Sequence, residues 1–202
     1  KANGTTAKTQ AMAEAKSSWD QKADKEYFEN VKDVDSYELF KPMLANDFTK
    51  TPVTSGYTQP KLDGIRCLVN NHGMNSRSGK PINSCPHIAD ALKDFTKDYP
   101  SITLDGELYN HELKSDFQKI VSLVRKVKCR PEEIAESAEL VEYHIYDMFD
   151  ADAPDMPFIE RMHFLVKHLP VDAKIKIVET AKTDTTADID KMYGEYTEAG
   201  YE

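Results

Sequence analysis

Residues 59–66 read Gln-Pro-Lys-Leu-Asp-Gly-Ile-Arg, and the rest of the chain is organised around this stretch. Pro60 fixes its own backbone φ and biases the residue before it toward an extended conformation. Gly64 permits a sharp turn or a close approach to a ligand. Beyond the glycine, side chains alternate in the manner typical of a β-strand. We therefore expect a strand–turn–strand hairpin over 57–70, with Lys61 at its mouth.

Lys61 is the candidate nucleophile of this stretch. A lysine that loses its hydration becomes a neutral, nucleophilic amine more easily. Asp63 is placed to hold or deprotonate it, and the guanidinium of Arg66 offers a fork of donors suited to a phosphate or a ribose. The plainer interpretation is a surface hairpin with ordinary charges, because Lys-x-Asp-Gly is common turn chemistry.

The composition is that of a globular protein with a well-solvated surface. The chain has 202 residues, of which 40% are hydrophobic and 30% charged. This length suits one large domain, or one domain with an appendage. No apolar run approaches the ~20 residues of a membrane span. Three widely spaced cysteines indicate a reducing, cytosolic compartment. The start Lys-Ala-Asn-Gly, without an initiator Met, suggests a fragment whose first part is missing.

The charge balance is acidic overall but basic locally. A net charge of −9 is unfavourable for binding nucleic acid, which requires clustered cations. Residues 114–130 nevertheless carry six cationic side chains and one acidic one. Apolar residues between them predict an amphipathic helix, whose cations form either a solvated face or a binding surface.

The N-terminal part differs from the rest. Residues 7–29 are rich in Ala, Lys, Glu and Gln without Pro or Gly, which predicts a helix. We expect the boundary near 35–40, and so an N-terminal helical segment over 1–40, the tail of an accessory domain, before a main domain over 41–202. The alternative for this segment is a solvated connecting helix.

The main domain mixes strand and helix signals. A polar loop is expected over 74–82. Strands are expected at Ile102–Leu104, 143–150 and 175–178, and helices at 86–98, 158–169 and 185–197, with another helix opening at Pro131.

Four further short motifs follow the first one in order. The stretch Lys61–Arg66 resembles the lysine motif of ATP-dependent DNA ligases, within the covalent nucleotidyltransferase superfamily. Residues 76–79 (Ser-Arg-Ser-Gly) and 105–107 (Asp-Gly-Glu) resemble the second and third motifs of that family. Residues 145–147 (Ile-Tyr-Asp) resemble the aromatic-Asp motif, and 200–202 (Gly-Tyr-Glu) the start of the next. Singly, these motifs are also compatible with a loop, a turn and a core strand.

The resemblance covers about 45–202 and is closest to the phage-type ligases. It implies an α+β fold: a nucleotidyltransferase (ATP-grasp-like) adenylation domain, with antiparallel sheets flanked by helices and the nucleotide between them. The family's paired-lysine motif and its C-terminal OB-fold domain do not follow Glu202 in this sequence. We therefore expect a domain truncated before the OB-fold domain.

The resemblance also implies roles for individual residues. Lys61 would attack the α-phosphate of ATP and carry AMP through a phosphoramidate bond. Gln59 would accept a hydrogen bond from the adenine amino group, where many relatives have Glu. Tyr146 would stack on adenine, where the family more often has Phe.

Charged residues would hold the phosphates, the ribose and a metal. Glu107 would contact ribose or a divalent metal, Mg²⁺ or Mn²⁺, and Glu202 would be a second metal-coordinating acid. Arg66 and Arg77 would hold ribose and phosphates, first of ATP and later of the 5′ end of a DNA nick.

The implied function is sealing of nicks in duplex DNA through a lysyl-AMP intermediate, in replication, repair or recombination. The expected protein is a monomer of the bacterial or host cytosol with no membrane partner. An RNA ligase or an mRNA-capping-type nucleotidyltransferase stays open, because the Gln59 amide can flip to match either purine. So does a catalytically silent nucleotide- or DNA-binding module, whereas an NAD-dependent ligase fits less well.

Overall fold

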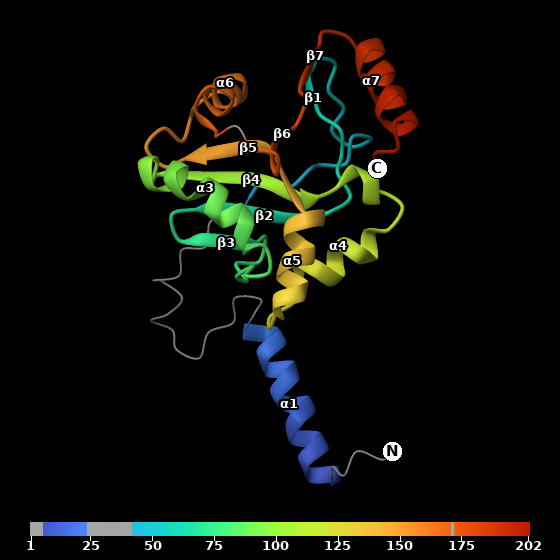
Figure 1. The fold of residues 1–202 in the computed structure, drawn as a ribbon. Helices are drawn as coiled ribbons and strands as arrows, with labels where there is room; N and C mark the ends of the chain where they lie inside the picture. Colours follow the sequence, from blue (N-terminus) through green and yellow to red (C-terminus); the bar gives the residue numbers. More distant parts are fainter. Residues whose placement is uncertain (1–5, 24–41, 171) are drawn as a thin grey trace. The chain divides into compact units, whose positions relative to one another are not determined.

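The fold is built on a mixed sheet, shown in Figure 1 for a computed structural model that describes residues 6–23, 42–170 and 172–202. Within these residues the sheet has five strands in the order β3-β2-β4-β5-β6. Neighbouring strands are antiparallel except β5 and β6, which are parallel. Their bounds are β2 Ile65–Asn70, β3 Gly73–Ser76, β4 Ile102–Tyr109, β5 Glu142–Asp150 and β6 Ile175–Ile177.

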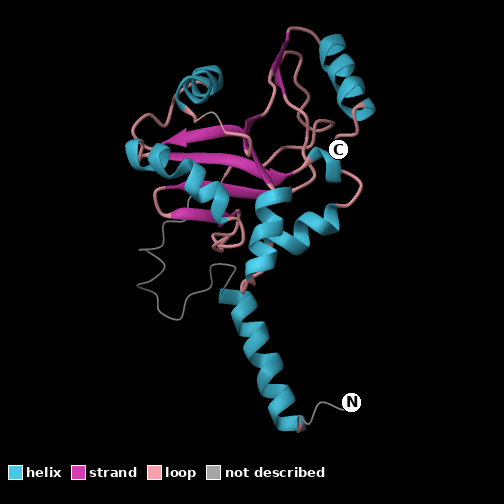
Figure 2. Cartoon of the chain, in the orientation of Figure 1, coloured by secondary structure: helices cyan, strands magenta, loops and turns pink. Residues whose placement is uncertain are grey.

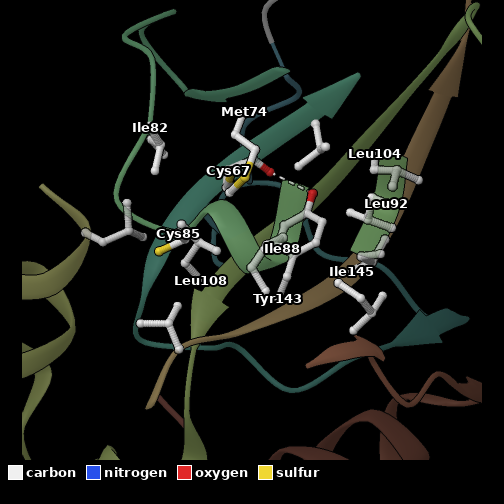
Figure 3. Close-up of a cluster of buried hydrophobic side chains, with 14 of the residues drawn as sticks. Cys67, Met74, Ile82, Cys85, Ile88, Leu92, Leu104, Leu108, Tyr143 and Ile145 are labelled. Carbon is white, nitrogen blue, oxygen red and sulfur yellow. Dashed lines mark hydrogen bonds between the residues drawn. The ribbon is translucent and has the colours of Figure 1, made fainter. Parts of the chain in front are cut away.

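One face of this sheet carries the apolar core, because alternate residues of β2 and β4 point toward it together with Tyr143, Ile145 and Met148 of β5. Four of the described helices contribute to that core or pack beside it: α3 Pro86–Asp98, α4 Phe117–Val124, α5 Pro131–Leu140 and α6 Phe158–His168. Figure 3 shows Tyr143 of β5 within this cluster, where its hydroxyl donates to the backbone carbonyl of Cys67 at 2.9 Å. Ile88 and Leu92 of α3 are fully buried beside it. The opposite face of the sheet is therefore left for polar side chains.

Several predicted elements are confirmed. The helix expected over 86–98 is α3, and α6 Phe158–His168 and α7 Thr186–Glu198 match the other two periodic segments. Strand β4 extends the expected Ile102–Leu104 segment to Tyr109. Figure 2 shows this combination of antiparallel strands and surrounding helices, in agreement with the predicted α+β fold.

Two local predictions are wrong. The basic stretch 114–130 forms a helix only over Phe117–Val124, and its last six residues are not helical. The loop expected over 74–82 begins with strand β3 instead. Met74 pairs with Val69 of β2 and is buried, so it adds apolar area to the core.

The hairpin predicted over 57–70 does not form. Strand β1, Gly56–Thr58, pairs antiparallel with β7, Ala181–Thr183, in a separate two-stranded sheet. Strand β2 pairs with β3 and β4 in the central sheet. Lys61 therefore lies on a link between two sheets, and segments more than a hundred residues apart in the chain meet beside it.

The chain divides into two compact units, Lys1–Lys41 and Pro42–Glu202. In the first unit the structure describes helix α1, Ala7–Ala23, and all of its residues are exposed. The rest of the helix predicted over 7–29, and the expected boundary near 35–40, lie outside the described residues. Among the residues that are described, no helix has both the length and the apolar composition needed to cross a bilayer.

Candidate active site

A pocket of about 350 Å³ lies on the polar face of the central sheet. Its lining comes from both sheets, from α6 and from the segment before β1: Met43, Tyr57, Gln59, Arg66, Asp105, Tyr146, Asp147, Phe158 and Arg161. Three residues predicted to bind a nucleotide, Gln59, Arg66 and Tyr146, are thus brought together. A pocket with one aromatic wall and several fixed polar groups is typical of a small-molecule site.

Arg66 is held by the carboxylate of Asp105. Its Nε donates to one oxygen of Asp105 at 2.9 Å and its Nη2 to the other at 2.5 Å, while Nη1 donates to the Met43 carbonyl at 2.9 Å. The guanidinium carbon lies 5.6 Å from the centre of the Tyr146 ring. The hydrogen-bonded Asp105 raises the pKa of Arg66. Arg66 is therefore a fixed positive charge that keeps N–H groups on Nη1 and Nη2 for a ligand.

Glu107 lies directly opposite Arg66 in the register of β2 and β4. Burial raises the pKa of its carboxyl to about 8, although the nearby charges of Arg66 and Lys61 act in the other direction. Glu107 is therefore mostly protonated at neutral pH. It carries a full charge there only when a further positive group compensates for its burial.

A β-bulge places Tyr146 in the pocket. Asp105 pairs with Asp147 and Gly106 pairs with Ile145, so Tyr146 is the extra residue on β5. Ile145 points into the core on one side of the bulge, and the next fully buried residue is Met148, three positions on. A regular strand would place only one of Tyr146 and Asp147 on the pocket face. The bulge places both there. Burial and the acidic neighbours Asp105 and Glu107 raise the pKa of Tyr146 and keep its phenol neutral.

The side chain of Gln59 bridges the two sheets. Its amide nitrogen donates to the backbone carbonyl of Tyr146 at 3.0 Å and to the hydroxyl of Thr180 at 2.9 Å. Tyr146 belongs to β5, whereas Thr180 lies just before β7. The orientation of this amide is therefore determined by acceptors from both walls.

Lys61 lies at the edge of this arrangement and is paired with Glu202. Their side chains form an ion pair, and the backbone N–H of Glu202 donates to the carbonyl of Lys61 at 3.2 Å. The Lys61 side chain is 65% exposed, so the desolvation expected from the sequence is not present. Its positive charge nevertheless acts on Glu107. The structure thus brings the predicted nucleophile near both predicted metal-binding acids.

Gly64 is required by a close approach of the link to strand β4. A Cβ atom at this position would lie 2.4 Å from the Leu108 carbonyl oxygen and 2.7 Å from the Glu107 side chain. A Cβ atom does not fit at such short distances, so any residue other than glycine would force the surrounding structure to shift. The glycine therefore lets the link that carries Lys61 pack closely against Glu107. The close approach that the sequence suggested is made to strand β4.

The C-terminal segment that carries Glu202 is anchored by η1, His111–Leu113, and the residue after it. Lys114 Nζ donates to the carbonyl of Ala199 at 2.8 Å, and the His111 ring lies 4.4 Å from the ring of Tyr201. Gly200 has a φ of +88°, which favours glycine and turns the chain after α7. These contacts fix the direction from which Glu202 reaches Lys61.

Arg77 is not brought into this group. It is exposed in the turn after β3 and is absent from the pocket lining. Within the described part of the chain, no cluster of three or more His, Cys, Asp or Glu side chains forms a metal site. Lys61 instead connects the two acids that were predicted to bind a metal: it is paired with Glu202, and its charge acts on Glu107.

Several site residues were not predicted from the sequence. Arg161 of α6 donates through Nε and Nη2 to the two oxygens of Asp147 at 2.7 and 2.8 Å. Thr180 holds Gln59 from the other sheet. The only signal for Arg161 is a cation on an otherwise amphipathic helix, and Thr180 gives none, because both act through distant parts of the chain.

Comparison with known proteins identifies one family over most of the chain. The family model described as "ATP dependent DNA ligase domain" matches residues 42–202. A DNA ligase of Archaeoglobus fulgidus is 29% identical over 153 residues, which cover 70% of this chain and 26% of that protein. A DNA ligase of Haemophilus influenzae is 24% identical over 127 residues, which cover 63% of this chain and 41% of that protein.

The fold comparison agrees with the sequence comparison. A solved structure from a study of Lig E DNA ligases superimposes with a TM-score of 0.63 at 18% identity. The match covers 82% of this chain and 60% of that one, and it establishes the fold. The chain spans well under half the length of the two curated relatives.

Proposed function

The chain belongs to the ATP-dependent DNA ligase family, and from this premise we propose that it is the adenylation domain of an enzyme that seals nicks in duplex DNA. The observation that carries the proposal is the position of Lys61. Its amine is paired with Glu202, acts on Glu107 and adjoins the pocket lined by Gln59, Arg66 and Tyr146. A nucleophile, two carboxylates and a base pocket are the parts that nucleotidyl transfer needs.

In the first step the Lys61 ammonium gives up a proton, and Glu202 is the base in contact with it. The neutral Nζ attacks the α-phosphorus of ATP, so an N–P bond forms while the P–O bond to pyrophosphate breaks. Tyr146 stacks on adenine and Gln59 contacts its edge, while Arg66 and Glu107 contact ribose and phosphate. Arg66 is charged and fixed beforehand, which reduces the reorganisation that the step requires.

In the next steps AMP leaves the protein for DNA. An oxygen of a 5′-phosphate attacks the adenylate phosphorus and the N–P bond to Lys61 breaks. A 3′-hydroxyl then attacks the activated 5′-phosphate, and AMP departs as the backbone closes. We assign Arg77 to the 5′-phosphate of the nick, since its exposed guanidinium stands free of the pocket lining.

The donor set beside Lys61 fits a divalent cation. Glu107 and Glu202 would supply oxygen ligands, and Mg²⁺ is commonly held by one or two carboxylates together with substrate phosphates. Mg²⁺ or Mn²⁺ bound there would neutralise charge on the phosphates. It would also be the positive group that favours an ionised Glu107.

The partner we propose is nicked duplex DNA, acted on by a monomer during replication, repair or recombination. We place the protein in the cytosol, where Cys67, Cys85 and Cys129, which are all free, would stay reduced.

The test is transfer of label from α-labelled ATP to the full-length protein, read on a denaturing gel. Label is expected on the unmodified protein and lost in Lys61→Ala. The matched control is Lys182→Ala, which removes a lysine of similar exposure that is also ion-paired, and it should keep the label. Label from GTP instead would indicate a capping-type enzyme. No label from any nucleotide would indicate a silent binding module.

A further inference from the structure

We propose that Thr180 is a positioning residue that fixes the Gln59 amide, so that Gln59 presents its oxygen, and only its oxygen, to the nucleotide base. The proposal deepens the function proposed above and rests on it, because it assigns the choice of base to that same pocket. It identifies the preferred ligand by its chemistry, a purine with an amino group rather than a carbonyl at C6.

The first constraint on the amide comes from β5. A backbone carbonyl has no hydrogen to give, so the Gln59 group that faces the Tyr146 carbonyl at 3.0 Å must be the N–H₂. A flipped amide would place two carbonyl oxygens against each other. Because Tyr146 is the bulged residue of β5, this carbonyl is set by the same irregularity that aims the Tyr146 ring.

The second constraint comes from Thr180, and the orientation of the amide depends on both. The Thr180 hydroxyl donates its single hydrogen to the carbonyl of Val178 at 3.2 Å. Its oxygen can therefore only accept from Gln59, at 2.9 Å. Both neighbours thus require a donor from Gln59, and together they occupy the two N–H groups of the amide.

The remaining atom of the amide, Oε1, is an acceptor with no hydrogen-bond partner within the described residues, on a side chain that lines the pocket. An exocyclic amino group donates to such an oxygen. A carbonyl at the same ring position would instead face another acceptor, and an unpaired buried acceptor is costly. The choice between purines that the sequence left open is therefore made by Thr180 and the Tyr146 carbonyl. A carboxylate at position 59 would repel the same carbonyl, which explains an amide here.

The experiment compares ATP with ITP, which differ at C6 of the base, an amino group in ATP and a carbonyl in ITP. The variants are Thr180→Val, which removes the acceptor, and Thr180→Ser, which keeps it. Two quantities are measured on the full-length protein: kcat/KM for label transfer to Lys61, and equilibrium binding of each nucleotide to the Lys61→Ala form. Thermal unfolding midpoints check that each variant is folded.

The unmodified protein should favour ATP over ITP by about tenfold or more in both measurements, the usual effect of one hydrogen bond against an unpaired acceptor. Thr180→Ser should keep this ratio, and Thr180→Val should lower it about fivefold or more. An unchanged ratio in a folded Thr180→Val protein would overturn the proposal while label transfer still supported the ligase function. If neither ATP nor ITP binds, both this proposal and the proposed ligase function are overturned.

Discussion

Folding changes the protonation of Glu107, because its carboxyl is buried next to another acid, Asp105. With a folded pKa of about 8 and an ordinary value of 4.5, the folded chain binds a proton here that the unfolded chain has lost. The contribution of this carboxyl to the free energy of unfolding is fully present below about pH 4.5. It decreases as the pH rises through about 8. The carboxyl thus favours the folded state in its neutral form.

Replacing Glu107 by Gln should therefore flatten the pH dependence of the free energy of unfolding. At pH 9, without nucleotide and with metal chelated, Glu107→Gln should be more stable than the unmodified chain by at least about 1 kcal/mol. Near pH 4 the two should be similar. Denaturant unfolding at several pH values measures this, with the exposed Glu198→Gln as the control. Parallel curves for the Glu107→Gln and unmodified chains would contradict the assigned burial.

At the scale of elements, the bulge in β5 is stabilised by α6. Arg161 donates to both oxygens of Asp147, and its Nη1 donates to the carbonyl of Met156 at 2.6 Å. The guanidinium carbon also lies 5.6 Å from the centre of the Phe158 ring. Asp147 follows the bulged Tyr146 directly, so this clamp fixes the backbone that aims the aromatic ring into the pocket. Helix α6 thereby acts on the site without supplying the reacting group.

Removing the clamp should cost both stability and nucleotide affinity. Arg161→Met leaves Asp147 partly buried without its partner and should lower the free energy of unfolding by about 1–3 kcal/mol. Because Tyr146 then loses its fixed position, KM for ATP should rise more than kcat falls. The control is Arg130→Met, whose ion pair with Glu133 is exposed on the arginine side and should affect the free energy of unfolding much less than the Arg161 pair does. Equal losses of unfolding free energy in Arg161→Met and Arg130→Met would show that Arg161 does not stabilise the bulge.

The sequence predicted elements where the signal is local. Ile88, Leu92 and Phe95 recur at helical spacing, and they form the buried face of α3. In contrast, the helix predicted over 114–130 ends at Val124, and the next apolar residue, Val127, is exposed and adds nothing to the core. The bulge at Tyr146 was not predictable, since the alternation of β5 gives no sign of an extra residue before its partner strand is known.

At the scale of the whole main unit, the pocket depends on pairings between distant segments. The motifs located Gln59, Arg66 and Tyr146, which line one pocket, because each motif carries its chemistry in a few adjacent residues. The pairing of β1 with β7 joins residues 56–58 to 181–183, and no local pattern indicates it. Thr180 and Arg161 belong to the site only through such long-range contacts. What the sequence could not provide is therefore the geometry between elements, while the chemistry within each motif was readable.

Helix α1 should contribute little to the stability of the main unit. Helix α1 buries none of its residues, and its Met12 and Trp19 side chains are more than half exposed. Without apolar burial, a helix of this length is marginal in water. A protein lacking residues 1–23 should therefore unfold within about 2 °C of the unmodified midpoint, measured by circular dichroism. It retains Met43, whose carbonyl accepts from Arg66.

The single tryptophan of the chain makes the same point in the intact protein. Trp19 lies in α1, so its fluorescence reports the N-terminal unit, whereas circular dichroism is dominated by the larger unit. If the two units are energetically independent, Trp19 emission should already be that of a water-exposed indole and should show no cooperative change at the main transition. A coincident transition in both signals, or a drop of more than about 5 °C on removing residues 1–23, would contradict the energetic independence of helix α1.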